Sequence, residues 1–191
     1  MEWQGLSSVE CEGFEVCIMT KTHWRRVDYR AESLRVTIGA LDECIESLLV
    51  KTKTQDWYDG VWLLEESEPI IGLGFVAFQN YVNSSIYDRH EELVKQYEKY
   101  STGAEKLKNE RTKVELIIAI ANYFKHRDSL GDLHEPTRQI LADFKLNYAK
   151  DADVFNSPIL KGFDILSEKN ELSEIMELIF EWRKSLWLEE N

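Results

Sequence analysis

Two polar side chains lie one helical turn apart in an otherwise apolar segment, and their chemical types suit proton transfer or hydrogen bonding. Asn122 and His126 are four residues apart, so in a helix they fall on one face. Glu115 and Ala119 share that face. An imidazole titrates near neutral pH and can serve as general acid or base beside an amide. We therefore interpret this face as a candidate catalytic or binding site.

A second polar pair with the same spacing, Gln79 and Asn83, occurs in the preceding apolar segment. If the two segments form antiparallel helices that pack together, these side chains could lie close to one another. We predict a polar cluster made of Gln79, Asn83, Glu115, Asn122 and His126. The competing interpretation is structural: Asn122 and His126 form a buried polar pair that satisfies itself and fixes the register of a helix contact.

At this segment the chain resembles the HEPN superfamily of small helical bundles. Ribonuclease members carry Arg, then a polar residue such as Asn, and His about a turn later. Asn122 and His126 match that pattern, but Ala121 stands where the nucleases have Arg. The resemblance covers residues 69–128 and implies metal-independent RNA cleavage at a homodimer interface. It would make Asn122, His126 and Arg127 the catalytic residues, with Arg127 replacing the missing cation.

A connector at residues 51–66 combines aromatic and acidic side chains and has no Lys or Arg after Lys53. Tryptophan and tyrosine anchor protein interfaces, and carboxylates steer a basic partner. We predict a binding surface composed of Asp56, Trp57, Tyr58, Asp59, Trp62, Glu65 and Glu66. In the alternative interpretation, the aromatic rings are buried against the bundle and only the acids face solvent.

Other motifs that carry chemistry are missing from the sequence. His126, Asp128, Asp132, His134 and Glu135 lie close together in the chain, but their spacing matches no zinc or calcium pattern. No glycine-rich phosphate loop and no nucleophile motif occurs. We therefore expect no metal and no cofactor.

The elements that must position these residues are helices. Apolar residues recur at intervals of three and four in 30–50 and 172–186, which is typical of amphipathic helices. Start signals predict further helices at 69–87, after Ser67 and Pro69, at 112–125, after the Thr112 capping box, and after Pro136 and Pro158. Residues 12–20 show a weak strand pattern. The fold class is all-α: a single domain over residues 1–191, built as one bundle of about six helices.

Composition narrows the classes of function. The chain has 191 residues, 43% of them hydrophobic, and a formal net charge of −12. That charge is the wrong sign for binding RNA through its phosphates, and it favours a basic protein partner. The N-terminus lacks the pattern of a secretory signal and no stretch resembles a membrane span, so we expect a cytoplasmic protein.

Two functional hypotheses follow. The first is an acidic helical binding protein that neutralises a basic partner, as bacterial immunity proteins and antitoxins do with nuclease toxins. The alternative is a HEPN-type ribonuclease or RNA-binding protein that uses the face of Asn122 and His126.

Overall fold

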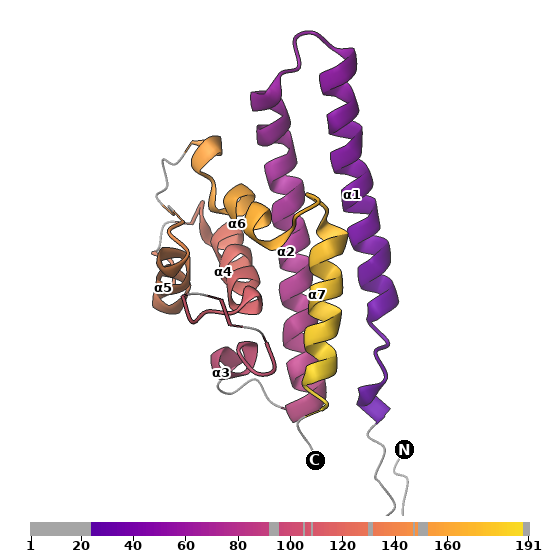
Figure 1. Ribbon diagram of the computed structural model, residues 1–191, viewed down its shortest axis with the longest axis vertical. Coiled ribbons are helices and arrows are strands. Elements are labelled where there is room, and N and C mark those ends of the chain that lie inside the picture. Colours follow the sequence, from indigo (N-terminus) through magenta and orange to yellow (C-terminus); the bar gives the residue numbers. More distant parts are fainter. Residues whose placement is uncertain are drawn as a thin grey trace, which may run out of the picture.

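The computed structural model describes residues 24–91, 96–104, 106–107, 109–129, 132–146, 148 and 153–188. All regular elements within them are helices (Figure 1). The α-helices are α1 (Ala31–Thr54), α2 (Gly60–His90), α3 (Gln96–Tyr100), α4 (Lys113–His126), α5 (Glu135–Asp143), α6 (Pro158–Leu166) and α7 (Leu172–Ser185). Two short 3₁₀ turns, η1 (Trp24–Arg26) and η2 (Val154–Asn156), complete them. The all-α prediction is confirmed, whereas the predicted strand at 12–20 lies outside the described residues.

The long helix α2 occupies the centre of the fold. It contacts α1 and α7 on one side and α4 and α6 on the other, while α5 packs on α4 (Figure 1). Glu68, Gly72 and Gln79 of α2 lie against Arg127, Phe124 and Asn122, respectively. Residue numbers rise along α2 as they fall along α4, so the two helices are antiparallel.

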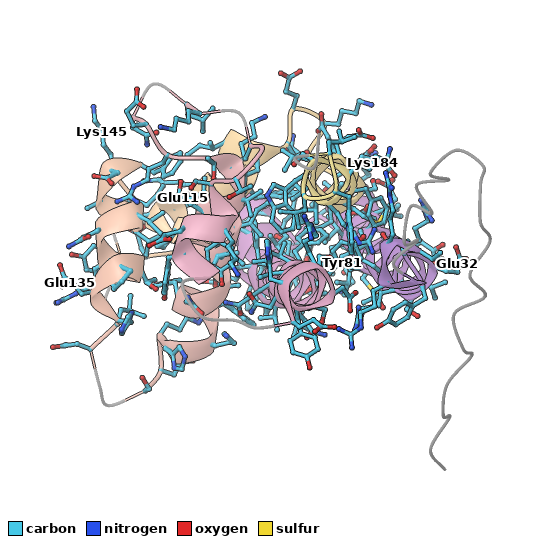
Figure 2. The ribbon with its side chains drawn as sticks, turned by 90° about the horizontal axis from the view of Figure 1, so that it is seen from below. Glu32, Tyr81, Glu115, Glu135, Lys145 and Lys184 are labelled. Carbon is cyan, nitrogen blue, oxygen red and sulfur yellow. The ribbon has the colours of Figure 1, made fainter. Side chains whose placement is uncertain are left out.

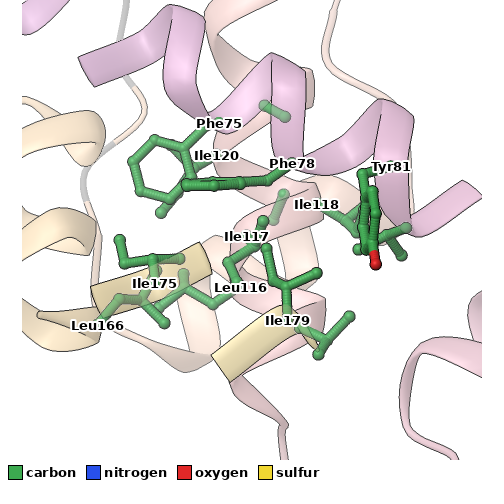
Figure 3. Close-up of a cluster of buried hydrophobic side chains, with 14 of the residues drawn as sticks. Phe75, Phe78, Tyr81, Leu116, Ile117, Ile118, Ile120, Leu166, Ile175 and Ile179 are labelled. Carbon is green, nitrogen blue, oxygen red and sulfur yellow. The ribbon is translucent and has the colours of Figure 1, made fainter. Parts of the chain in front are cut away.

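The hydrophobic core lies where α2, α4 and α7 meet. Phe75 and Phe78 from α2, Ile117 and Ile120 from α4, and Ile179 from α7 are completely buried and point toward one another (Figure 3). Viewed from below the bundle, Tyr81 also lies in the interior, whereas Glu32, Glu135 and Lys184 extend outward (Figure 2). Burial of this apolar surface is the main force that holds the helices together.

The start of α2 corrects the sequence prediction. Ser67 and Pro69 do not begin a helix, because α2 already starts at Gly60 and contains Pro69 within it. The Asp59 side chain caps this start by accepting hydrogen bonds from the amides of Val61 (2.9 Å) and Trp62 (3.2 Å). An aspartate at this position satisfies two free amide groups, and the exposed side of the helix tolerates the proline.

Two other predicted helix starts are confirmed. The Thr112 hydroxyl accepts from the Glu115 amide at 3.2 Å, and the Glu115 carboxylate accepts from the Thr112 amide at 2.7 Å. Ser157 caps α6 ahead of Pro158 by accepting from the Ile159 amide. These local bonds fix where α4 and α6 begin.

Candidate functional site

Asn122 is a bridge between three helices. The Gln79 amide nitrogen on α2 donates to Asn122 Oδ1 at 2.8 Å, and Asn122 Nδ2 donates to Thr137 Oγ1 on α5 at 3.3 Å. Gln79 and Thr137 are buried. Because both ends of the Asn122 amide are used inside the protein, its contacts match the structural interpretation for this residue.

The other two proposed catalytic residues occupy different surroundings. His126 is exposed at the last position of α4. Arg127 forms an ion pair with Glu68 at 3.0 Å, and its guanidinium lies 5.2 Å from the centre of the Phe124 ring. Glu68 also accepts a hydrogen bond from the Ser157 hydroxyl. Arg127, the cation expected to replace the missing arginine, is therefore already held by a carboxylate.

The five residues of the predicted polar cluster do not form one hydrogen-bonded group within the described residues. Gln79 meets Asn122, but Asn83 accepts a hydrogen bond from the Tyr100 hydroxyl at 2.8 Å. Glu115 turns back to cap α4 and pairs with Arg111 at 3.0 Å. Of the predicted cluster, only the pair of Gln79 and Asn122 is therefore joined by a hydrogen bond in the described part of the chain, and the cluster as a whole stays a prediction.

The predicted acidic and aromatic surface lies at the turn between α1 and α2, which projects beyond the other helices (Figure 1). Only residues 55–59 separate the two helices. Tyr58 is buried at this turn, with 2% of its surface exposed. Its hydroxyl donates to Glu66 Oε2 at 2.9 Å, and Lys51 Nζ donates to the same oxygen at 3.1 Å. Tyr58, Glu66 and Lys51 therefore hold the turn together.

These contacts shift the pKa of both acidic groups. The Tyr58 hydrogen bond, followed by that from Lys51, lowers the pKa of Glu66. Burial, together with the adjacent Glu66 carboxylate, raises the pKa of Tyr58. At neutral pH the pair is thus a phenol that donates to a carboxylate, which is the stable arrangement.

The remaining residues of the turn face solvent. Trp57 is 67% exposed and Trp62 is 47% exposed, and their rings meet edge to face with centroids 6.3 Å apart. Asp56 and Glu65 are exposed beside them and have no ion pair or hydrogen bond from their side chains within the described part of the chain. We call Asp56, Trp57, Trp62 and Glu65 the acidic aromatic tip.

A groove that sequence reasoning did not find lies next to this tip. Its volume is about 660 Å³, and it is bordered by α1, α2, α6 and the segment that leads into α7. The apolar lining consists of Ile45, Leu49, Leu63, Leu64, Ile71, Leu160 and Phe163. The acidic lining consists of Asp42, Glu43, Glu46, Asp164 and Glu171, and Lys169 is its one basic residue. The apolar and acidic spacing within α1 was visible in the sequence, but the remote segments that complete the groove were not.

Asp42 builds one end of this groove. Its two carboxylate oxygens accept from the backbone amides of Leu172 (2.8 Å) and Ser173 (3.0 Å). A side chain of α1 therefore caps the first turn of α7, where a negative charge is favourable. This cap fixes the segment before α7 against α1 and keeps the groove in shape.

The described residues show neither a metal-binding group nor a membrane-spanning helix. They contain no group of three or more His, Cys, Asp or Glu side chains arranged to hold a metal ion. None of their helices combines the length and apolar character needed to cross a bilayer. Comparison of the chain with protein-family models, curated proteins and solved structures finds no match, so the acidic aromatic tip and the groove stand on their geometry.

Proposed function

We propose that this chain is an acidic binding protein that neutralises a basic protein partner, in the manner of an immunity protein or antitoxin acting on a toxin such as a nuclease. The observation that carries the proposal is the exposure of Trp57 and Trp62 next to Asp56 and Glu65. Exposed tryptophan rings are enriched at protein interfaces, and here they lie beside carboxylates that have no hydrogen bond or ion pair within the described residues.

Each half of the acidic aromatic tip has a distinct physical task. The carboxylates, together with the net charge of −12, attract a basic surface and speed its association. Trp57 and Trp62 lose exposed apolar area on binding and slow dissociation, because large rigid rings lose little entropy when they are buried. The partner that fits this surface is therefore basic and has an apolar area large enough to cover the two indoles.

The test is affinity capture from the lysate of the source cells with the purified full-length chain. It uses a charge variant, Asp56→Lys with Glu65→Lys, and an aromatic variant, Trp57→Ala with Trp62→Ala. We expect the wild type to retain a basic protein at about 50 mM sodium chloride and to lose it at about 500 mM. Each variant should bind the recovered partner about tenfold more weakly.

A matched control separates the tip from overall charge. Glu32→Lys with Glu177→Lys makes the same change in charge at exposed acids on the far end of α1 and on α7. This control should bind the partner nearly as well as the wild type. Equal losses in the control and in the tip variants would show that overall charge, not the tip, determines binding, and the proposal would fail.

The ribonuclease alternative stays a prediction. The exposure of His126 favours it, since a catalytic imidazole must reach substrate. The internal contacts of Asn122 and Arg127 count against it. His126→Ala decides the matter in an RNA cleavage assay: loss of cleavage with an unchanged circular dichroism spectrum supports the enzyme, and unchanged cleavage removes His126 from the mechanism.

A further inference from the structure

The groove beside the acidic aromatic tip has the shape and chemistry of a second contact surface. We propose that it receives the apolar side chains of a basic amphipathic helix presented by the protein partner. This inference rests on the proposed function and names the part of the partner that is recognised.

The floor of the groove is apolar and open. Leu63 and Leu64 on α2 and Leu49 on α1 are each only half-buried, and Leu160 of α6 completes the floor with partial exposure. The volume of about 660 Å³ lies within the range of typical ligand-binding clefts, which is about 300–1,000 Å³. Such a floor accommodates a few large side chains, which a helix supplies from one face at positions i, i+3, i+4 and i+7.

The border of the groove selects for positive charge. Glu43 and Glu46 on α1 and Asp164 on α6 are exposed, and within the described residues their carboxylates have no ion-pair partner. Partial burial raises the pKa of Asp164, which is a cost to its ionised form. A lysine or arginine on the partner helix would relieve that cost, because an opposite charge stabilises the ionised form.

Charge also argues against two other occupants of the groove, a second copy of this chain and the chain's own residues 1–23. A second copy would bring another net charge of −12 to a surface that is already acidic. The residues 1–23 contain four Glu and one Lys, so this segment has the same sign as the groove. A basic helix from another protein is the occupant with complementary charge.

The groove and the acidic aromatic tip are built on the same two helices. Side chains within 42–49 of α1 and 63–71 of α2 line the groove, and the same two helices lead directly to the turn at 55–59. One partner can therefore contact the tip and the groove at once, and contacts made by linked segments reinforce each other.

The experiment measures fluorescence anisotropy of a labelled synthetic peptide bound to the full-length protein. The peptide is helix-forming, with leucine at i, i+3, i+4 and i+7 and lysine elsewhere. A floor variant, Leu63→Gln with Leu64→Gln, adds no charge. A border variant combines Glu43→Gln, Glu46→Gln and Asp164→Asn. We expect each variant to weaken binding about tenfold, and only the border variant to reduce the salt dependence.

Matched controls exclude general attraction between opposite charges. Glu32→Gln with Glu168→Gln and Glu177→Gln removes three exposed acids outside the groove lining and should change affinity less than about twofold. A peptide with glutamate in place of lysine and one with serine in place of leucine should not bind. Circular dichroism and thermal melting verify folding, and the border variant keeps the test decisive if the floor variant does not fold.

Several results would overturn the inference. Wild-type affinity in both groove variants would do so. An equal loss of affinity in the control that removes Glu32, Glu168 and Glu177 would do so as well. Competition by a synthetic peptide of residues 1–23 would show that the groove belongs to the chain's own segment. Self-association in sedimentation that the floor variant abolishes would show that it belongs to a second copy.

The two proposals fail in different ways. If the tip variants release the captured partner while both groove variants retain the peptide and the partner, the binding function stands and the groove inference fails. If no basic protein is captured but the peptide binds as expected, the groove is a basic-helix site and the proposed role of the tip fails.

Discussion

At the scale of single residues, two of the three side chains that suggested catalysis are held by other residues of the protein. Asn122 uses both ends of its amide between Gln79 and Thr137, and Arg127 is paired with Glu68. A buried polar group without a partner is costly, so such groups are hydrogen-bonded even where they have no catalytic task. Exposure is therefore a better guide to candidate functional residues than residue type alone, and it leaves Trp57, Trp62 and His126 as candidates.

The role of Asn122 can be measured through stability. Asn122→Ala leaves Gln79 and Thr137 without their partner, so we expect the free energy of unfolding to fall by roughly 1–3 kcal/mol in urea denaturation. Asn80→Ala, at an exposed position of α2 next to Gln79, should change it by less than about 0.5 kcal/mol. Equal effects of the two substitutions would contradict the bridging role.

The contribution of the turn between α1 and α2 to stability depends on pH. Its hydrogen bonds lower the pKa of Glu66 below the ordinary value of 4.5, so the folded state favours the carboxylate. The stability from this group is present above pH 4.5 and is lost as the pH falls through the lowered pKa. Glu66→Gln should therefore be less stable than the wild type near neutral pH, with a difference that narrows in acid.

Urea denaturation at a series of pH values measures that difference. Glu65→Gln, the exposed neighbour without a hydrogen bond in the described part of the chain, serves as the control. Its stability should follow the wild-type curve in parallel. A Glu66→Gln difference that stays constant with pH would mean that the carboxylate charge does not stabilise the turn.

At the scale of elements, close packing of the central helix against its neighbours positions the tip and the groove. A Cβ atom at Gly72 would lie 2.4 Å from the Phe124 ring, and one at Gly74 would lie 2.9 Å from the Leu172 side chain. Glycine at these positions lets α4 and the start of α7 approach α2. The approach of α7 also brings Leu172 to its cap on Asp42.

A pair of glycine substitutions separates packing from helix propensity. Gly72→Ala must displace the Phe124 ring, so we expect it to lower the free energy of unfolding by about 1–3 kcal/mol. Gly39→Ala, on α1 with no atom within 4 Å of the added Cβ, should raise it by roughly 0.5–1 kcal/mol. Thermal and urea denaturation measure both. Stabilisation by Gly72→Ala would show that Phe124 moves aside without cost.

At the scale of the whole molecule, the excess of acidic residues affects folding as well as binding. A net charge of −12 creates repulsion within the folded chain, and salt screens it. Raising sodium chloride from about 20 mM to about 300 mM should increase the free energy of unfolding in urea by a few tenths to about 1 kcal/mol. The same salt should weaken partner binding. A fall in stability would mean that ion pairs outweigh the repulsion.

Local signals in the sequence were sufficient for most of the helices, because spacing and capping depend on neighbouring residues. The capping box at Thr112 and the apolar spacing of α1 and α7 are of this kind. The start of α2 was missed because Ser67 and Pro69 resemble a helix start, while the stronger cap, Asp59, lay in a segment interpreted as a connector. Aromatic residues there gave no indication that the turn would be so short.

The sequence by itself determined the helical class, the acidic charge and the residue types available for binding. Only the tertiary structure decided that Tyr58 is buried while Trp57 and Trp62 are exposed, because a partner for the tyrosine hydroxyl lies on the next helix. It also decided that Asn122 is a bridge and that α1, α2, α6 and the start of α7 enclose a groove. Such contacts join residues far apart in the chain, and helical periodicity carries no information about which faces meet.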